Sequence, residues 1–84
     1  MTRIDKLYER LRADPGQLLA FQDFVTLIEA FGFAHVRTKG SHRSYSHPAC
    51  PHLLVIQPKS KEAKRYQVRE FLGMIEEYNL ARDP

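Results

Sequence analysis

The sequence predicts an α+β fold: a three-stranded antiparallel sheet with helices on one face, in the order α-α-β-β-β-α. Three observations support this class. Apolar residues recur at helical spacing in two segments before residue 33 and in one segment after residue 64. Between these segments, the spacing changes to short alternating or apolar runs that Gly and Pro interrupt. The connections between these runs are short, which favours an antiparallel meander.

Three segments have the apolar spacing of amphipathic helices. The first covers residues 3–12 and ends at the turn residues Asp14-Pro15-Gly16. The second ends at Gly32, because a glycine is favoured just past the C-terminus of a helix. The third follows a basic loop. Their apolar faces consist of Ile4, Leu7, Tyr8 and Leu11; of Phe21, Phe24, Val25, Ile28 and Phe31; and of Val68, Phe71, Leu72, Ile75 and Tyr78.

Three strands are predicted between the second and third helices. Residues 33–37 form the first strand, and Lys39-Gly40 form its turn. Residues 43–47 alternate small polar with larger side chains, as a half-buried strand does. Residues 53–56 form a short apolar strand that Pro58 ends.

Alternation along the second strand assigns its residues to two faces. If Tyr45 points at the helices, the period of two places Arg43 and His47 on the same side. The open side of the sheet then carries His42, Ser44 and Ser46.

Charge is distributed unevenly along the chain. The net charge is +3, but residues 34–69 hold eight Lys and Arg residues against one acid, Glu62, which gives this block a net charge of +7. A block of one sign favours a polyanionic partner, most often a nucleic acid. The alternative is a solvated basic face without a ligand.

Composition excludes several classes of protein. An apolar fraction of 43% is that of a globular chain and argues against disorder. No apolar run approaches the roughly 20 residues that span a bilayer, and the first residues lack the apolar stretch of a signal peptide. Cys50 is the single cysteine, so we expect no internal disulfide and a cytoplasmic location.

The segment Lys39-Gly40-Ser41-His42-Arg43 combines a glycine turn, a hydroxyl, an imidazole and two cations. Cleavage of RNA without a metal needs a base for the ribose 2′-hydroxyl and cations for the phosphate. His42 fits the first role, and Lys39 and Arg43 fit the second. The amides near Gly40 and Ser41 can add donors. Because no Asp or Glu lies between residues 29 and 62, this segment cannot supply a carboxylate-held magnesium site. The alternative is a surface histidine in a hairpin turn.

Arg65 and Arg69 form a second basic pair, four residues apart on the predicted last helix. Both can contact one phosphate backbone; the alternative is a soluble start of a helix. Tyr66, next to Arg65, either stacks on a nucleobase or covers the core.

His47, Cys50 and His52 have the spacing H-x2-C-x-H, which suggests zinc. Structural zinc needs four ligands, usually in paired short spacings. The fourth ligand here would have to come from His35 or His42 on other segments. We therefore expect a loop with incidental polar residues, and no metal or other cofactor.

Several short motifs together resemble HicA-type toxins, which are small mRNA interferases of bacterial and archaeal toxin–antitoxin pairs. The resemblance covers roughly residues 22–80. Its most specific element is the Gly-Ser-His turn between two strands. The motifs are Phe31-Gly32-Phe33, Lys39-Gly40-Ser41-His42, Tyr45, His47-Pro48 and the apolar strand that ends in Pro58.

The resemblance implies a fold like that of double-stranded RNA-binding domains. We expect one domain over residues 1–84, with a HicA-like core at 21–80 and an N-terminal helical extension at 1–16. It also implies that His42 is catalytic, that the substrate is mRNA, and that a HicB-like antitoxin masks the site. The expected function is therefore that of a toxin acting as a metal-independent endoribonuclease, alone a monomer and with its antitoxin a hetero-oligomer. The alternatives are a non-catalytic RNA-binding module of the same fold and an antitoxin or protein-interaction domain.

Two places depart from the family pattern. Many members carry a histidine shortly after the proline that ends the third strand, and Gly-Thr-Leu at the start of the last helix. Here these places read Pro58-Lys59-Ser60 and Tyr66-Gln67-Val68. The family's phosphate contacts therefore do not carry over to them.

Overall fold

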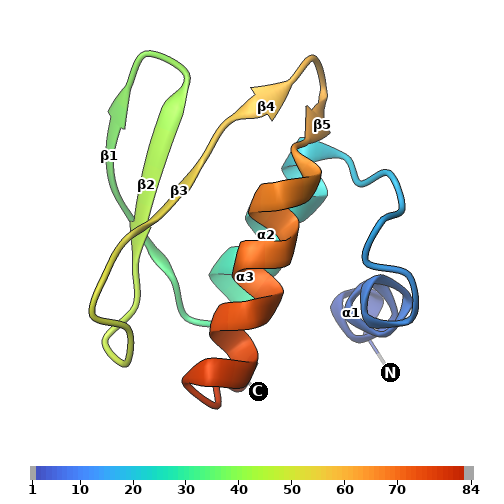
Figure 1. Cartoon of the computed structure of the whole chain (residues 1–84). Helices are drawn as coiled ribbons and strands as arrows, with labels where there is room; N and C mark the ends of the chain where they lie inside the picture. The colour runs from blue at the N-terminus through green and yellow to red at the C-terminus, as the bar shows by residue number, and fades with distance from the viewer. Residues whose placement is uncertain (1, 83–84) are drawn as a thin grey trace.

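The computed structural model describes residues 2–82 and has helices on one face of a three-stranded antiparallel sheet (Figure 1). The predicted fold class and element order are confirmed, and the arrangement is consistent with a fold like that of double-stranded RNA-binding domains. Strand boundaries differ from the predicted ones by at most two residues. The elements are α1 (Arg3–Ala13), α2 (Phe21–Ala30), β1 (Ala34–Lys39), β2 (His42–Ser46), β3 (Leu54–Ile56), β4 (Pro58–Lys59), β5 (Glu62–Ala63) and α3 (Arg65–Glu77).

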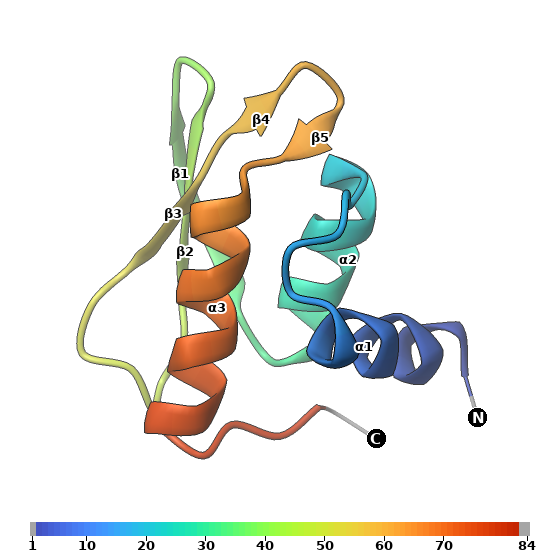
Figure 2. The same ribbon diagram turned by 45° about the vertical axis from the view of Figure 1, so that its right-hand side comes forward.

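The sheet has the order β1-β2-β3, so β2 is its central strand. Figure 2 shows the sheet nearly edge-on, with α2 and α3 on one side of it and α1 beyond them. None of the helices that the structure describes covers the other face of the sheet. Within residues 2–82, no helix combines the length and the apolar character needed to cross a bilayer.

Aromatic side chains from both helices and the sheet fill the core. Phe71 of α3 is fully buried, and its ring lies 5.8 Å from that of Phe24, 5.6 Å from that of Phe31 and 5.9 Å from that of Phe33, centroid to centroid. All three pairs are edge-to-face or tilted, the geometry that the ring quadrupole favours. Tyr45 closes the core from the sheet and is 2% exposed.

The N-terminal helix α1 packs into this core. Leu11 is fully buried, and the Tyr8 ring lies 4.9 Å from that of Phe31. Thr2 and Asp5 form a capping box at the start of the helix. An ion pair of 2.5 Å joins Arg3 to Asp23 of α2. The apolar face of α1 therefore packs against α2, with Leu11 fully buried and Ile4, Leu7 and Tyr8 partly buried.

The basic segment after Pro58, expected to be a loop, contains a short hairpin. β4 pairs with β5, and Ser60 in the turn has a φ of +60°. The Phe21 amide donates to the carbonyl oxygen of Lys61, and the Ala63 amide donates to the carbonyl oxygen of Leu19. These hydrogen bonds hold the hairpin against the segment that begins α2. Such short strands leave no alternation to detect in the sequence, and their pairing depends on this distant segment.

Candidate functional site

The β1–β2 hairpin turns through Gly40 and Ser41. Gly40 has a φ of +61°, which favours glycine, and a positive φ at the first turn residue alone is the pattern of a type II′ turn. Lys39 and His42 are directly opposed on either side of this turn. Because opposed residues of an antiparallel pair point to the same face, their Cβ atoms lie about 5 Å apart. Both side chains are exposed to solvent.

A second cation shares the face of His42. Arg37 lies two residues before Lys39 and pairs with Ser44, so its side chain points to the same side. Arg37 was not among the site residues predicted from the sequence, although the period of two from Lys39 places it on the same face. A β-bulge between His35 and Arg37 separates His35 from this face. The His35 ring instead lies 5.4 Å from the Tyr45 ring.

Arg43 lies on the opposite face of the sheet from His42. Its guanidinium stands over the Phe21 ring, 5.2 Å from the centroid, and its backbone pairs with Thr38. From the sequence, Arg43 was expected to hold a phosphate beside His42, but neighbours on a strand point to opposite faces. Arg43 is therefore half-buried against α2 and does not join Lys39.

Small and apolar residues complete the open face. Ser44 is 7% exposed, because Arg37 on β1 and Val55 on β3 flank it. Val55, which is opposite Ser44, is 38% exposed. The described strands of this sheet carry no acidic side chain. The open face thus combines two cations, one imidazole and an exposed valine.

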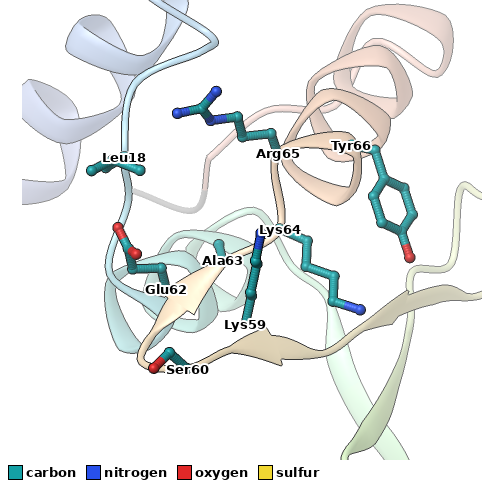
Figure 3. Close-up of a pocket in the computed structure, with 8 residues that line it drawn as sticks. All are labelled: Leu18, Lys59, Ser60, Glu62, Ala63, Lys64, Arg65 and Tyr66. Atoms are coloured by element: carbon teal, nitrogen blue, oxygen red, sulfur yellow. The ribbon is translucent and has the colours of Figure 1, made fainter.

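Arg65 and Arg69 are both exposed on α3, but they line different cavities. Arg65 lies at the start of the helix, and its side chain points toward Leu18 (Figure 3). Arg69 lies beside Tyr8 and Arg12 of α1. The pair sits on the helix side of the sheet, away from the face of His42. The complete lining of the Arg65 cavity is Leu18, Lys59, Ser60, Glu62, Ala63, Lys64, Arg65 and Tyr66.

The H-x2-C-x-H segment is divided among separate contacts. The Nδ1 atom of His47 accepts a hydrogen bond of 3.0 Å from the Ala49 amide, and its ring lies 5.1 Å from that of Phe33. His52 packs 6.1 Å from the ring of Tyr78. Burial, together with the charge of Glu77, raises the pKa of the half-buried Cys50 thiol. Within residues 2–82, no three His, Cys, Asp or Glu residues gather in a way that could hold a metal ion.

The fold and this face define a class: small α+β proteins that present a histidine and cations on an uncovered sheet. The chain belongs to the HicA toxin family, described as the HicA toxin of bacterial toxin–antitoxin, whose family model matches residues 21–76. The match begins with the first residue of α2 and leaves out α1. No curated protein and no solved structure shows significant similarity to the chain. Family membership makes the protein the toxin of a toxin–antitoxin pair and implies an antitoxin as its partner.

Proposed function

We propose that this toxin is a metal-independent endoribonuclease that cleaves mRNA, with His42 as the general base. The observation that carries the proposal is the direct opposition of Lys39 and His42 across the hairpin turn. This pairing places a proton acceptor and a phosphate-binding cation about 5 Å apart at the Cβ atoms, in open solvent.

In the reaction, an imidazole nitrogen of His42 takes the proton of a ribose 2′-hydroxyl. The 2′-oxygen then forms a bond to the adjacent phosphorus, and the bond from phosphorus to the 5′-oxygen of the next nucleotide breaks. The products are a 2′,3′-cyclic phosphate and a 5′-hydroxyl. A positioned base typically contributes about 10²–10⁴-fold to the rate.

Lys39 and Arg37 stabilise the negative charge on the phosphate oxygens during this step. The exposed amide of Ser41, next to the positive φ of Gly40, supplies a further donor. The leaving 5′-oxygen needs a proton, and the Lys39 ammonium is the charged donor opposite His42. His47 packs against Phe33 on the helix side of the sheet, away from this linkage.

The partner that we propose is a HicB-like antitoxin that covers the open face. The exposed Val55 lies on the same face of the sheet as Lys39 and His42. A partner that combines apolar contacts with acidic side chains would bury this valine and neutralise the cations.

The test is cleavage of a single-stranded RNA by the parent protein, by His42→Ala and by His52→Ala. His52 is also exposed, but it lies beside Tyr78 and away from the hairpin, so its substitution is the matched control. We expect His42→Ala to reduce cleavage about 10²–10⁴-fold and His52→Ala to leave it unchanged. A chelator should have no effect, and a 2′-deoxy nucleotide at the cleaved position should block the reaction.

Three other results would reject the proposal. Undiminished cleavage by His42→Ala would show that His42 is not the general base. Salt-sensitive RNA binding without cleavage by any variant would indicate a non-catalytic RNA-binding module. No RNA binding at all, together with binding of an acidic protein, would indicate a protein-interaction domain.

A further inference from the structure

Tyr66 presents an aromatic ring to solvent at the start of α3. The sequence allowed two interpretations, a cover over the core or a stacking surface. Tyr66 is 61% exposed, while the next two residues, Gln67 and Val68, are 3% and 2% exposed and close the core beneath it. Tyr66 therefore does not cover the core, and its exposure needs another explanation.

Hydrogen bonds hold the Tyr66 hydroxyl in place. The side-chain amide of Gln67 donates to this hydroxyl at 3.2 Å, and the Oε1 atom of Gln67 accepts from the Gln57 amide at 2.9 Å. Gln57 directly follows β3, so the buried Gln67 connects the ring to the end of the sheet. A ring that is already fixed loses little conformational freedom when a ligand stacks on it.

Most charged residues of the cavity that Tyr66 lines are cations. Tyr66 lines a cavity of about 740 Å³, a size typical of small-molecule sites. Lys59, Lys64 and Arg65 line the same cavity against one acid, Glu62. In Figure 3, the side chains of Lys64 and Tyr66 extend to the same side, and Arg65 extends to the other. An aromatic surface beside several cations fits a nucleotide, whose base stacks and whose phosphate carries negative charge.

The ring lies toward the end of the molecule that carries His42. β3 is an edge strand of the sheet, and Ile56 at its end pairs with Arg43, the neighbour of His42. Both views place the tip of the β1–β2 hairpin and the β4–β5 hairpin at the same end of the molecule (Figures 1 and 2). An RNA strand bound at His42 would have to turn around the β3 edge to approach the start of α3.

From these observations we propose that Tyr66 stacks on a nucleobase of the bound RNA near the cleaved linkage, with Lys64 on the adjoining phosphate. The proposal rests on the proposed function, since the ligand is the RNA substrate. It assigns Tyr66 a role in positioning and selecting the RNA and none in the proton transfers.

The test measures RNA binding in the His42→Ala background, so that the RNA stays intact. A labelled single-stranded oligonucleotide is titrated with this protein and with versions that also carry Tyr66→Ala, Tyr66→Phe or His52→Ala. We expect Tyr66→Ala to lower the affinity at least about fivefold, and Tyr66→Phe to retain most of it, because stacking needs the ring. His52 is an exposed ring that lies beside Tyr78 and outside this cavity, so His52→Ala should leave the affinity unchanged.

A second variant separates base stacking from phosphate binding. Tyr66→Trp introduces the only tryptophan of the chain. Its fluorescence should be quenched by the RNA but not by inorganic tripolyphosphate. Thermal melting of each variant shows whether it is folded.

Each result supports or overturns the inference. Equal affinities of Tyr66→Ala and its parent would overturn it. An equal loss of affinity in His52→Ala would also overturn it, because the loss would then not depend on the position of the ring. If the unmutated chain cleaves RNA but Tyr66→Ala binds RNA as tightly as its parent, the stacking role of Tyr66 is wrong and the proposed reaction still stands. Binding that depends on Tyr66, with no cleavage by the unmutated chain, would support the stacking and reject the proposed reaction.

Discussion

Lys39 and Arg43 lie four residues apart, but the sheet places them on opposite faces, and this difference can be tested directly. Lys39 shares the open face with His42, whereas the Arg43 guanidinium stands 5.2 Å from the centre of the Phe21 ring. Replacing each cation by glutamine should therefore have different consequences. Lys39→Gln should change RNA binding and leave stability unchanged, and Arg43→Gln should do the reverse.

The magnitudes follow from the two environments. Each phosphate contact on a single strand contributes about 0.7 to the slope of log affinity against log salt concentration. Losing the Lys39 contact should reduce this slope by about 0.7. Over a fourfold rise in salt concentration, the affinity of the parent should then fall about 2.5-fold more than that of Lys39→Gln. Replacing both Arg37 and Lys39 should double the change in slope, and the corresponding difference between parent and variant should be about sevenfold. Loss of the contact between Arg43 and Phe21 should cost about 1 kcal/mol, which lowers Tm by about 4–8 °C.

The assay is RNA binding in the His42→Ala background at four or more salt concentrations, with thermal melting of the same proteins. If Arg43→Gln reduces the slope of log affinity against log salt concentration as much as Lys39→Gln does, Arg43 also contacts phosphate and the assignment to opposite faces is wrong. If Lys39→Gln leaves this slope unchanged, Lys39 contacts no phosphate.

Three further predictions concern stability. Gly32 has a φ of +91°, and a Cβ there would lie 3.1 Å from Nε2 of His47, so Gly32→Ala should cost about 2 kcal/mol in thermal or urea unfolding; an unchanged Tm would contradict this. Gly73 lies inside α3 with open space around it, so Gly73→Ala should stabilise the protein by about 0.5–1 kcal/mol, and a lower Tm would show an unseen clash. Hydrogen bonding from the Thr2 amide holds the pKa of Asp5 below its usual 3.8. Because the pKa of Asp5 is lower in the folded than in the unfolded protein, its charge stabilises the fold at pH values above the unfolded-state pKa. This stabilisation is lost as the pH falls through the folded-state pKa, so the Tm advantage of the parent over Asp5→Asn should be full at pH 7 and shrink below about pH 4. A constant advantage across this range would assign the effect of Asp5 to something other than its charge.

Much of the fold could be predicted because its signals are local. The helical spacing before Gly32 and the apolar stripe around Phe71 predict helices whatever lies next to them. Gly32 and Gly40 both adopt positive φ angles at the places where the sequence predicts a helix end and a turn. Alternation around Tyr45 also predicted correctly that His42 lies on the open side.

Other features depend on segments that are distant in the sequence. The bulge that turns His35 away from Arg37 exists only in the pairing of β1 with β2. The β4–β5 hairpin is held by the segment that begins α2.

The element order, the basic middle block and the histidine in the hairpin turn are predictable from the sequence, because periodicity, turn chemistry and charge act over a few neighbouring residues. Which cations accompany that histidine depends on the tertiary structure. It placed Lys39 and Arg37 beside His42 and directed Arg43 to Phe21, and it separated Arg65 from Arg69 into two cavities. Which groups share a face depends on strand register and helix packing, and these are fixed by contacts between residues far apart in the chain.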